Sequence, residues 1–271
     1  VCAGSTVSVS DTSQGNGLVY RWQVSGGASI SDTTLAAPEV TFPDNQAPNA
    51  DTTYTLTLIV TSEDGCVDTA TQNIVIHARP SASFSMDSAQ CGSYSGVLSD
   101  FSQFSGPGPL TYAWSASSSP LGAVYSFSSV STPSPTLDLP VPSVDSVVYY
   151  VSQLVTDSYG CSDEDVDTIV VYARPTASFS ASESDTCGVY EVLGKITDNS
   201  SSGLTVDGTL VRRWLVERDN VVLHDSVGVS LDYRFTNSGV DDSVYTITLM
   251  VTNARGCMDT VSEDLTIYPD A

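Results

Sequence analysis

The side chains best suited to covalent chemistry in this sequence are 6 cysteines that recur in step along the chain. They form two sets, one near the start of each repeat and one directly after a glycine near its end: Cys2, Cys91 and Cys187, then Cys66, Cys161 and Cys257. None lies in the Cys-x-x-Cys spacing of a zinc site. Matched cysteines of this kind are typical of disulfides formed in an oxidising compartment. We therefore expect a secreted, extracellular chain whose cysteines form disulfides.

Groups that could act in catalysis are scarce. The sequence has 2 histidines, His77 and His224, with no Ser-His-Asp order, no Gly-x-Ser-x-Gly turn and no Gly-rich phosphate loop. His77 stands where Tyr172 and Tyr268 stand in the other repeats, which is a packing position. We therefore expect no enzymatic activity and no cofactor beyond the calcium considered next.

The densest acidic run is Asp163-Glu164-Asp165-Val166-Asp167, directly after Cys161. Alternate residues of a strand share one face, so Asp163, Asp165 and Asp167 are candidate ligands for Ca²⁺, which prefers oxygen donors. The run lacks the EF-hand spacing and occurs in one repeat. The alternative is a solvated strand edge whose charges prevent pairing with another sheet.

The overall charge excludes two classes of partner. With 9 basic against 32 acidic residues, the net charge is −23, and Lys195 is the single lysine. Such a surface repels nucleic acid and anionic membranes. No apolar run approaches the roughly 20 residues that a membrane span needs. We expect no nucleic-acid partner and no membrane insertion.

One pattern, repeated three times, defines the elements that must position these groups. Between Tyr54 and Val60, apolar residues alternate with polar ones, as in a strand with one buried face, and a turn at Gly65 leads to a returning strand over residues 73–76. The same pattern runs from Tyr149 to Cys161 and from Tyr245 to Cys257. A period of roughly 95 residues indicates an array of whole domains.

Each repeat also carries a tryptophan ahead of this hairpin, namely Trp22, Trp114 and Trp214. Several short strands, a central tryptophan and a late tyrosine-rich strand predict an all-β fold: a tandem array of three immunoglobulin-like β-sandwich domains. We expect the tryptophans to fill the space between the sheets as core residues. Stacking on carbohydrate is the alternative role.

The domain boundaries follow from a segment that precedes two of the repeats. Ala78-Arg79-Pro80-Ser-Ala-Ser-Phe84 recurs as residues 173–179. We therefore expect domains at 1–77, 78–173 and 174–271, the first of them without its first strand. The junctions contain proline and no Gly/Ser linker, which favours restricted motion between domains.

These motifs together resemble a known family. Pro-x-Ala-x-Phe, a later Trp, Tyr-x-hydrophobic-x-hydrophobic-x-Val-Thr and Gly-Cys-x-Asp are similar to the PKD and PKD-like repeats of giant surface adhesins and gliding-type proteins of Bacteroidetes bacteria. The resemblance covers all three repeats. It departs after the tryptophan, where the family's Trp-Asp-Phe-Gly-Asp-Gly is replaced, for example by Trp22-Gln-Val-Ser-Gly-Gly.

Two disulfide pairings are open at this point. Equal phase favours bonds within repeats: Cys2–Cys66, Cys91–Cys161 and Cys187–Cys257. In a sandwich, however, these partners would lie near opposite ends, some six strand residues of about 3.3 Å apart, whereas bridged Cα atoms lie within about 7 Å. Bonds between neighbouring domains, Cys2–Cys161 and Cys91–Cys257, satisfy that limit and leave Cys66 and Cys187 for repeats outside this sequence.

A further pattern concerns modification. An Asp followed by Ser or Thr and then a small or aliphatic residue is similar to the O-glycosylation motif of exported Bacteroidetes proteins. The acceptors that it predicts are Thr33, Thr52, Thr69, Ser88, Ser146, Thr168, Ser226, Ser243 and Thr260. Abundant Thr-Val pairs in strands are the alternative origin of this pattern.

Two functions are compatible with these observations. The first is a structural stalk or filament segment of a cell-surface adhesin, which gives reach and resistance to shear and whose partners are neighbouring repeats. The alternative is a glycan- or protein-binding accessory module of a secreted protein. That role requires exposed aromatic residues gathered at one end, and the nearest candidates are Tyr94, Phe101, Phe104, Tyr125 and Phe127.

Overall fold

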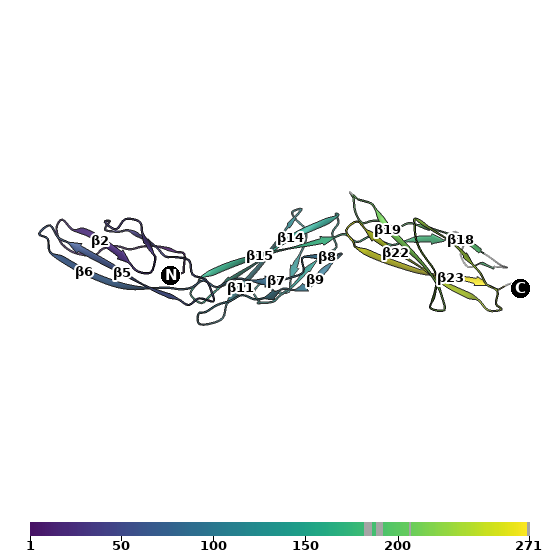
Figure 1. The fold of residues 1–271 in the computed structure, drawn as a ribbon, viewed down its shortest axis with the longest axis horizontal. Coiled ribbons are helices and arrows are strands. Elements are labelled where there is room, and N and C mark those ends of the chain that lie inside the picture. The colour runs from purple at the N-terminus through teal and green to yellow at the C-terminus, as the bar shows by residue number, and fades with distance from the viewer. Residues whose placement is uncertain (182–185, 188–191, 206, 270–271) are drawn as a thin grey trace.

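The computed structural model describes residues 1–181, 186–187, 192–205 and 207–269. Every regular element among them is a β-strand, which confirms the predicted all-β class. The strands form three sandwiches arranged end to end in a rod (Figure 1). The N-terminus lies beside the junction between the first and second sandwiches, and the C-terminus lies at the far end of the third.

The first sandwich consists of two three-stranded antiparallel sheets. One has the order β1 (Thr6–Ser8), β4 (Glu39–Thr41), β3 (Ser29–Ile30), and the other β2 (Val19–Val24), β5 (Thr52–Thr61), β6 (Val67–Ile76). The long hairpin β5–β6 is the alternating segment followed by its glycine turn. Its register joins Thr52 to Ile76 and Thr61 to Val67.

The second sandwich repeats this plan with additional strands at its start. The sheet that contains the long hairpin has the order β11 (Thr111–Ser119), β14 (Ser146–Thr156), β15 (Ser162–Tyr172), β8 (Ala89–Cys91). The facing strands are β12 (Ser126–Phe127), β13 (Thr136–Leu139) and β9 (Tyr94–Val97), and then β10 (Ser99–Asp100) paired with β7 (Phe84–Ser85). Strand β8 runs parallel to the end of β15, so Cys91 lies beside Tyr172.

The third sandwich follows the second closely. One sheet has the order β16 (Phe179–Ala181), β18 (Val192–Asp198), β21 (Ser230–Phe235). The other has the order β17 (Thr186–Cys187), β23 (Met258–Tyr268), β22 (Ser243–Asn253), β19 (Leu210–Arg218), β20 (Val221–Val227). At Asp219 and Asn220 the chain between β19 and β20 takes positive φ, which suits Asn and Asp in a tight turn.

Each sandwich has its own hydrophobic core, and each core contains one of the tryptophans. Trp22, Trp114 and Trp214 are 5%, 4% and 0% exposed. Each indole N–H donates a hydrogen bond to a backbone carbonyl, at Leu35, Thr132 and Gly228 respectively. The indoles are therefore buried with their polar atom satisfied and are not available to stack on a sugar.

The three cores draw on separate stretches of sequence. Their buried members span Ala3–Ile76, Phe84–Val171 and Ala177–Ile267. The divisions 1–77, 78–173 and 174–271 stay predictions about independently stable units. Limited proteolysis tests them, because cuts are expected near Ala78 and Arg174 and not inside the protected β5–β6 hairpin.

Candidate functional site

A disulfide bond closes each junction between neighbouring sandwiches. Cys2 is bonded to Cys161 with a Cα–Cα distance of 5.5 Å, and Cys91 is bonded to Cys257 with a Cα–Cα distance of 5.6 Å. Pairing within repeats is therefore wrong for these four cysteines. The reason is distance: Cys91 lies beside the end of β15 and Cys161 precedes its start, and 11 strand residues span roughly 35 Å.

Cys66 is a free and exposed thiol in this sequence, as the pairing between neighbouring domains leaves it. Cys66 occupies the same place after its glycine turn as Cys161 and Cys257, both of which are buried. Cys187 lies in β17 beside Tyr268. Its side chain falls outside the described part of the chain, so its pairing stays a prediction.

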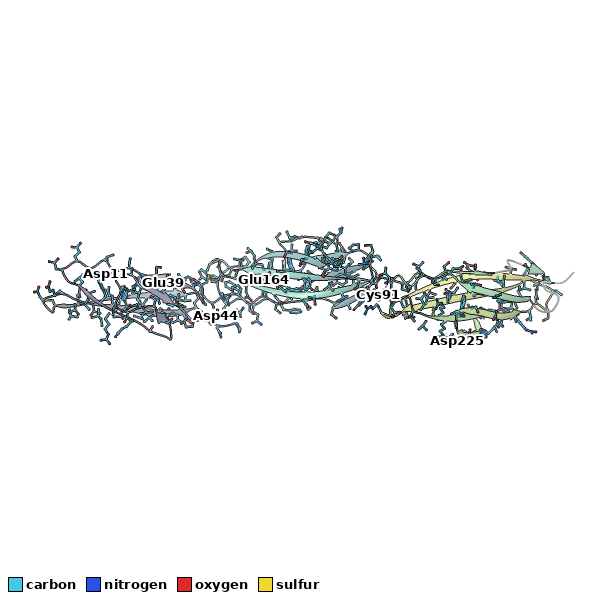
Figure 2. All side chains as sticks on the ribbon, turned by 90° about the horizontal axis from the view of Figure 1, so that it is seen from above. Asp11, Glu39, Asp44, Cys91, Glu164 and Asp225 are labelled. Atoms are coloured by element: carbon cyan, nitrogen blue, oxygen red, sulfur yellow. A yellow bond between two sulfur atoms is a disulfide. The ribbon has the colours of Figure 1, made fainter. Side chains whose placement is uncertain are left out.

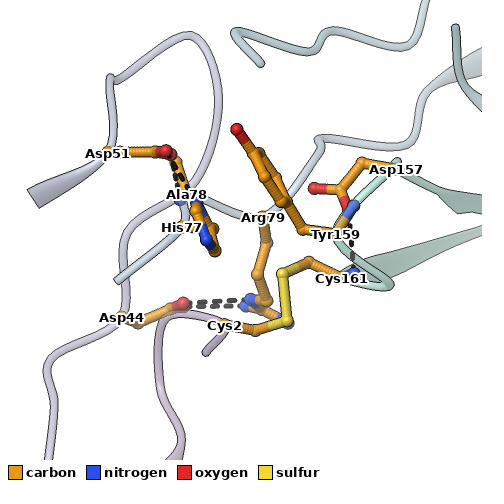
Figure 3. The surroundings of a disulfide bond; sticks show 9 residues. All are labelled: Cys2, Asp44, Asp51, His77, Ala78, Arg79, Asp157, Tyr159 and Cys161. Carbon is orange, nitrogen blue, oxygen red and sulfur yellow. Dashed lines mark hydrogen bonds and ion pairs between the residues drawn. A yellow bond between two sulfur atoms is a disulfide. The ribbon is translucent and has the colours of Figure 1, made fainter. Parts of the chain in front are cut away.

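The linker at the first junction is held by ionic and aromatic contacts around the disulfide (Figure 3). Arg79 forms an ion pair of 2.8 Å with Asp44 of the first sandwich. The His77 Nδ1 lies 2.7 Å from an oxygen of Asp51, and the His77 ring stacks on Tyr159 of the second sandwich with centroids 3.6 Å apart. His77 thus joins two sandwiches, which agrees with its interpretation as a packing residue.

The second junction uses the same positions with different chemistry. Tyr172 takes the place of His77, and the Arg255 guanidinium lies over its ring at 5.7 Å from the centroid. The Arg174 Nε donates to the carbonyl of Cys91 at 2.9 Å. Tyr159 and Arg255 each directly precede the glycine of a Gly-Cys turn. Neither residue was predicted to act at a junction, although this shared position is visible in the sequence.

In the second and third sandwiches, the aspartate of the Gly-Cys-x-Asp turn holds the segment that begins its own sandwich. Asp163 accepts the amide of Ala82 at 2.9 Å, and Asp259 accepts the amide of Ala177 at 2.8 Å. Asp163 also accepts the side-chain amide of Gln46 across the junction at 2.7 Å. The contact with Ala82 fastens the segment after Arg79-Pro80 to the second sandwich, and the contact with Gln46 joins the first sandwich to the second.

The same contacts bear on the calcium prediction. Asp163, Asp165 and Asp167 do lie on one face of β15, but each is engaged separately: Asp165 accepts the amide of Phe84 and Asp167 that of Thr168. Among the described residues, no group of three His, Cys, Asp or Glu side chains could hold one metal ion. The structure therefore does not bring the three carboxylates together as a site.

Asp157 and Asn253 cap the two Gly-Cys turns in the same way, with one difference. The Asp157 Oδ1 accepts the amides of Tyr159 and Cys161, as the Asn253 Oδ1 accepts those of Arg255 and Cys257. The Asn253 amide nitrogen then donates to the carbonyl of Ala173 across the junction and to the carbonyl of Ser202 in its own sandwich. The corresponding Asp157 Oδ2 is buried and has no hydrogen-bond partner.

This difference gives a stability prediction. Asp157→Asn replaces the unpaired buried oxygen with an amide nitrogen, the group that Asn253 has at the equivalent place, and we expect it to stabilise the second sandwich by about 1 kcal/mol. Asn253→Asp is the matched control, and it should destabilise the third sandwich by about 1–3 kcal/mol. Thermal unfolding at neutral pH measures both. Two changes of the same sign would contradict the argument.

Asp51 contacts both His77 and the Ala78 amide at the first junction, so we expect its ionisation to affect this junction. Partial burial disfavours its charged form, but hydrogen bonds from His77 and from the Ala78 amide outweigh this and hold the pKa of Asp51 below its ordinary 3.8. A lowered carboxylate pKa stabilises the folded state above pH 3.8, and that contribution is lost as the pH falls through the folded-state value.

We therefore expect Asp51→Asn to weaken the junction at pH 7 and to make progressively less difference below pH 3.8. Unfolding midpoints of both proteins between pH 7 and pH 2.5 measure the effect. A difference that persisted unchanged at the lowest pH would show that the loss is steric and not ionic.

The predicted glycosylation acceptors all lie at the surface. Thr33, Thr69, Ser88, Thr168 and Thr260 are exposed, and Thr52, Ser146, Ser226 and Ser243 are half-buried. Thr52 and Ser243 stand near the start of their strands on the same face as buried Tyr54 and Tyr245, and Ser226 is opposite buried Trp214. Glycosylation itself stays a prediction, which the intact mass of the natural protein tests.

The aromatic candidates for ligand binding do not form one exposed patch. Tyr94 belongs to the second core, and Phe104 and Phe127 are half-buried. Phe101 and Tyr125 remain exposed, at 60% and 37%. Tyr125 packs edge-on against Phe127, with ring centroids 5.9 Å apart.

Acidic side chains are distributed along the whole rod rather than gathered at one place. The labelled carboxylates Asp11, Glu39 and Asp44 lie on the first sandwich, Glu164 lies on the second and Asp225 on the third (Figure 2). No helix in the described ranges could cross a membrane.

Comparisons with known proteins return structural neighbours alone. No protein-family model and no curated protein matches the chain. An I-band fragment from titin has 11% identity and a TM-score of 0.44, covering 100% of this chain and 94% of that one. The N-terminal eight Ig domains of Down Syndrome Cell Adhesion Molecule have 12% identity and a TM-score of 0.48, with 100% and 35% covered. Protocadherin Gamma B2 cadherin domains 3–6 have 9% identity and a TM-score of 0.31, with 100% and 78% covered. The assignment of three immunoglobulin-like sandwiches rests on the strand pairing described above.

Proposed function

We propose that this chain is a load-bearing segment of an extracellular stalk, built from PKD-like repeats of the kind found in Bacteroidetes surface adhesins. Its role is to provide length and resistance to shear, without catalysis. The motifs shared by the repeats support the family. The acidic surface and the disulfides support an extracellular location.

One observation carries the stalk role: both disulfides join neighbouring sandwiches, and the loops that they close overlap. Cys2–Cys161 closes a loop with a sequence separation of 159, and Cys91–Cys257 closes one of 166. Cys91 lies within the loop closed by Cys2–Cys161, and Cys161 lies within the loop closed by Cys91–Cys257. Because Cys91 and Cys161 both belong to the second sandwich, this sandwich is bound covalently to both of its neighbours. A binding module has no need of such coupling, whereas a stalk under shear does.

The non-covalent contacts at the junctions also hold neighbouring sandwiches together. At each junction a ring of one sandwich lies against a side chain of the next, His77 on Tyr159 and Tyr172 under Arg255. Pro80 and Pro175 are buried in the linkers, and the proline ring limits the backbone freedom of each linker. These features restrain bending between neighbours.

Small-angle X-ray scattering with and without reductant tests the proposal. We expect an extended particle in both states and greater bending after reduction. A compact particle in the oxidised state would overturn the stalk role. Glycan binding by the oxidised chain, abolished by replacing exposed Phe101 and Tyr125 with Ser, would favour the accessory-module alternative.

A further inference from the structure

In two of the sandwiches, a Pro-x-Ala-x-Phe segment whose phenylalanine begins a short strand covers the core tryptophan. Phe84 of β7 lies edge-on to Trp114 with centroids 5.0 Å apart, and Phe179 of β16 lies edge-on to Trp214 at 5.5 Å. The backbone of β7 pairs antiparallel with β10, where Phe84 is opposite Asp100, and that of β16 pairs antiparallel with β18, where Phe179 is opposite Asp198. The strand therefore contributes a ring to the core and hydrogen bonds to the sheet.

In the first sandwich, the tryptophan has no such strand beside it, and a groove lies in the equivalent place. A groove of about 200 Å³ is lined by residues 10–13, Trp22, Leu56, Leu58 and residues 70–72. Leu58 and Val60 are each 7% exposed, whereas their counterparts in the second and third sandwiches are 0% exposed. Along β6, seven consecutive residues from Val67 to Asn73 are exposed.

The polar groups that would receive a strand are also in place. Asp11 accepts the amide of Ser13, as Asp100 accepts that of Ser102, so this edge of the groove has the same backbone turn. Residues 10–14 nevertheless belong to no strand. Asp68 stands in the position of Asp163 and Asp259, but the amide that it accepts is that of the adjacent Thr69.

Cys66 adds a second observation at the same end of the sandwich. It precedes Asp68 by two residues, and its counterparts Cys161 and Cys257 are bonded to the preceding sandwich. Both features are therefore covered in the other two copies: the sandwich's own first strand fills the groove, and a disulfide to the preceding sandwich buries the cysteine.

We propose that this groove is a strand-acceptor site for an Arg-Pro-x-Ala-x-Phe-Ser segment of the kind that begins each of the other two sandwiches. The segment would pair antiparallel with residues 10–14, place its phenylalanine against Trp22 and donate its alanine amide to Asp68. Backbone pairing supplies affinity in strand addition, and the phenylalanine in its pocket supplies specificity.

The test copies residues 79–89 directly ahead of Val1 in the full chain. This graft keeps its phenylalanine seven residues before Cys2, as Phe84 is before Cys91. We expect amide hydrogen exchange at Thr12 and Gln14 to slow by about tenfold or more. We also expect the unfolding midpoint of the first sandwich to rise.

Two controls keep the proposal falsifiable. The same graft with its phenylalanine replaced by Ala, and the intact graft combined with Asp68→Ala, should each lose most of the protection. Unchanged exchange in the intact graft, or equal protection without the phenylalanine, would overturn the strand-acceptor site. Either result would leave the stalk role standing, because scattering tests that separately.

Discussion

When the oxidised chain is pulled from its two ends and all three sandwiches unfold, its end-to-end length is expected to reach only about a third of the length of the reduced, unfolded chain. Between the bonded pair Cys2–Cys161 and the bonded pair Cys91–Cys257, three chain segments run in parallel: residues 2–91, 91–161 and 161–257. The shortest segment, of about 70 residues, limits the extension. With the ends included, about 85 residues become taut, which is ~300 Å against ~950 Å for the reduced chain.

Single cysteine variants give this prediction its sharpest form, because the effects of the two bonds should not add. Cys2→Ser leaves a taut path of about 105 residues and Cys91→Ser one of about 110, so each should lengthen the unfolded chain by only ~70–90 Å. The double variant should release the whole chain. The reason is that either remaining bond still bypasses more than half of the sequence.

Single-molecule force spectroscopy with terminal peptide tags measures these lengths. Bonds within repeats would behave differently: each closes a loop of about 64 to 70 residues, so each broken bond would add ~230 Å independently. Additive increments of that size would refute the coupling of neighbouring sandwiches. Because Cys66 is a free thiol, we also expect Cys66→Ser to leave the unfolded length of the oxidised chain unchanged.

The second large effect is expected at the tryptophans. Trp114→Ala and Trp214→Ala should each destabilise their own sandwich by about 3–5 kcal/mol, because each removes a large buried side chain and leaves a cavity. Trp22→Ala should destabilise the first sandwich less, because no phenylalanine of a first strand packs on the Trp22 indole. Such a ring pair contributes about 0.5–1.5 kcal/mol.

Hydrogen exchange resolved by residue measures the three sandwiches separately, and the Trp→Phe variants are the matched controls that keep an aromatic ring. The loss should be confined to the sandwich that carries the substitution. A Trp114→Ala protein with an unchanged unfolding midpoint and a lost affinity for glycan would show that the ring serves binding and not the core.

Local pattern in the sequence was sufficient for the architecture. The alternation from Tyr54 to Val60 required a strand with one buried face, and the glycine turn before Cys66 required the chain to return beside it. Repetition of both at a constant interval implied three similar sandwiches, with the tryptophans inside. These inferences hold because strand burial depends on a period of two residues, which is visible in the chain itself.

The contacts between sandwiches were not predictable in this way. The phase of the cysteines was compatible with bonds within repeats or between them, and the choice depended on which ends of the sandwiches meet. The same limit applies to Asp163: its sequence context suggested a cation site, whereas folding places the amides of Ala82 and Gln46 on its carboxylate.

What the sequence by itself determined is therefore each sandwich: its strands, its turns and the identity of its core. What only the tertiary structure decided is how the sandwiches are joined, from the bonds Cys2–Cys161 and Cys91–Cys257 to the pairing of His77 with Tyr159. The physical reason is range. Burial and turn formation act over a few neighbouring residues, whereas a junction brings together groups that are about 80 to 165 residues apart, whose proximity follows only from the packing of complete domains.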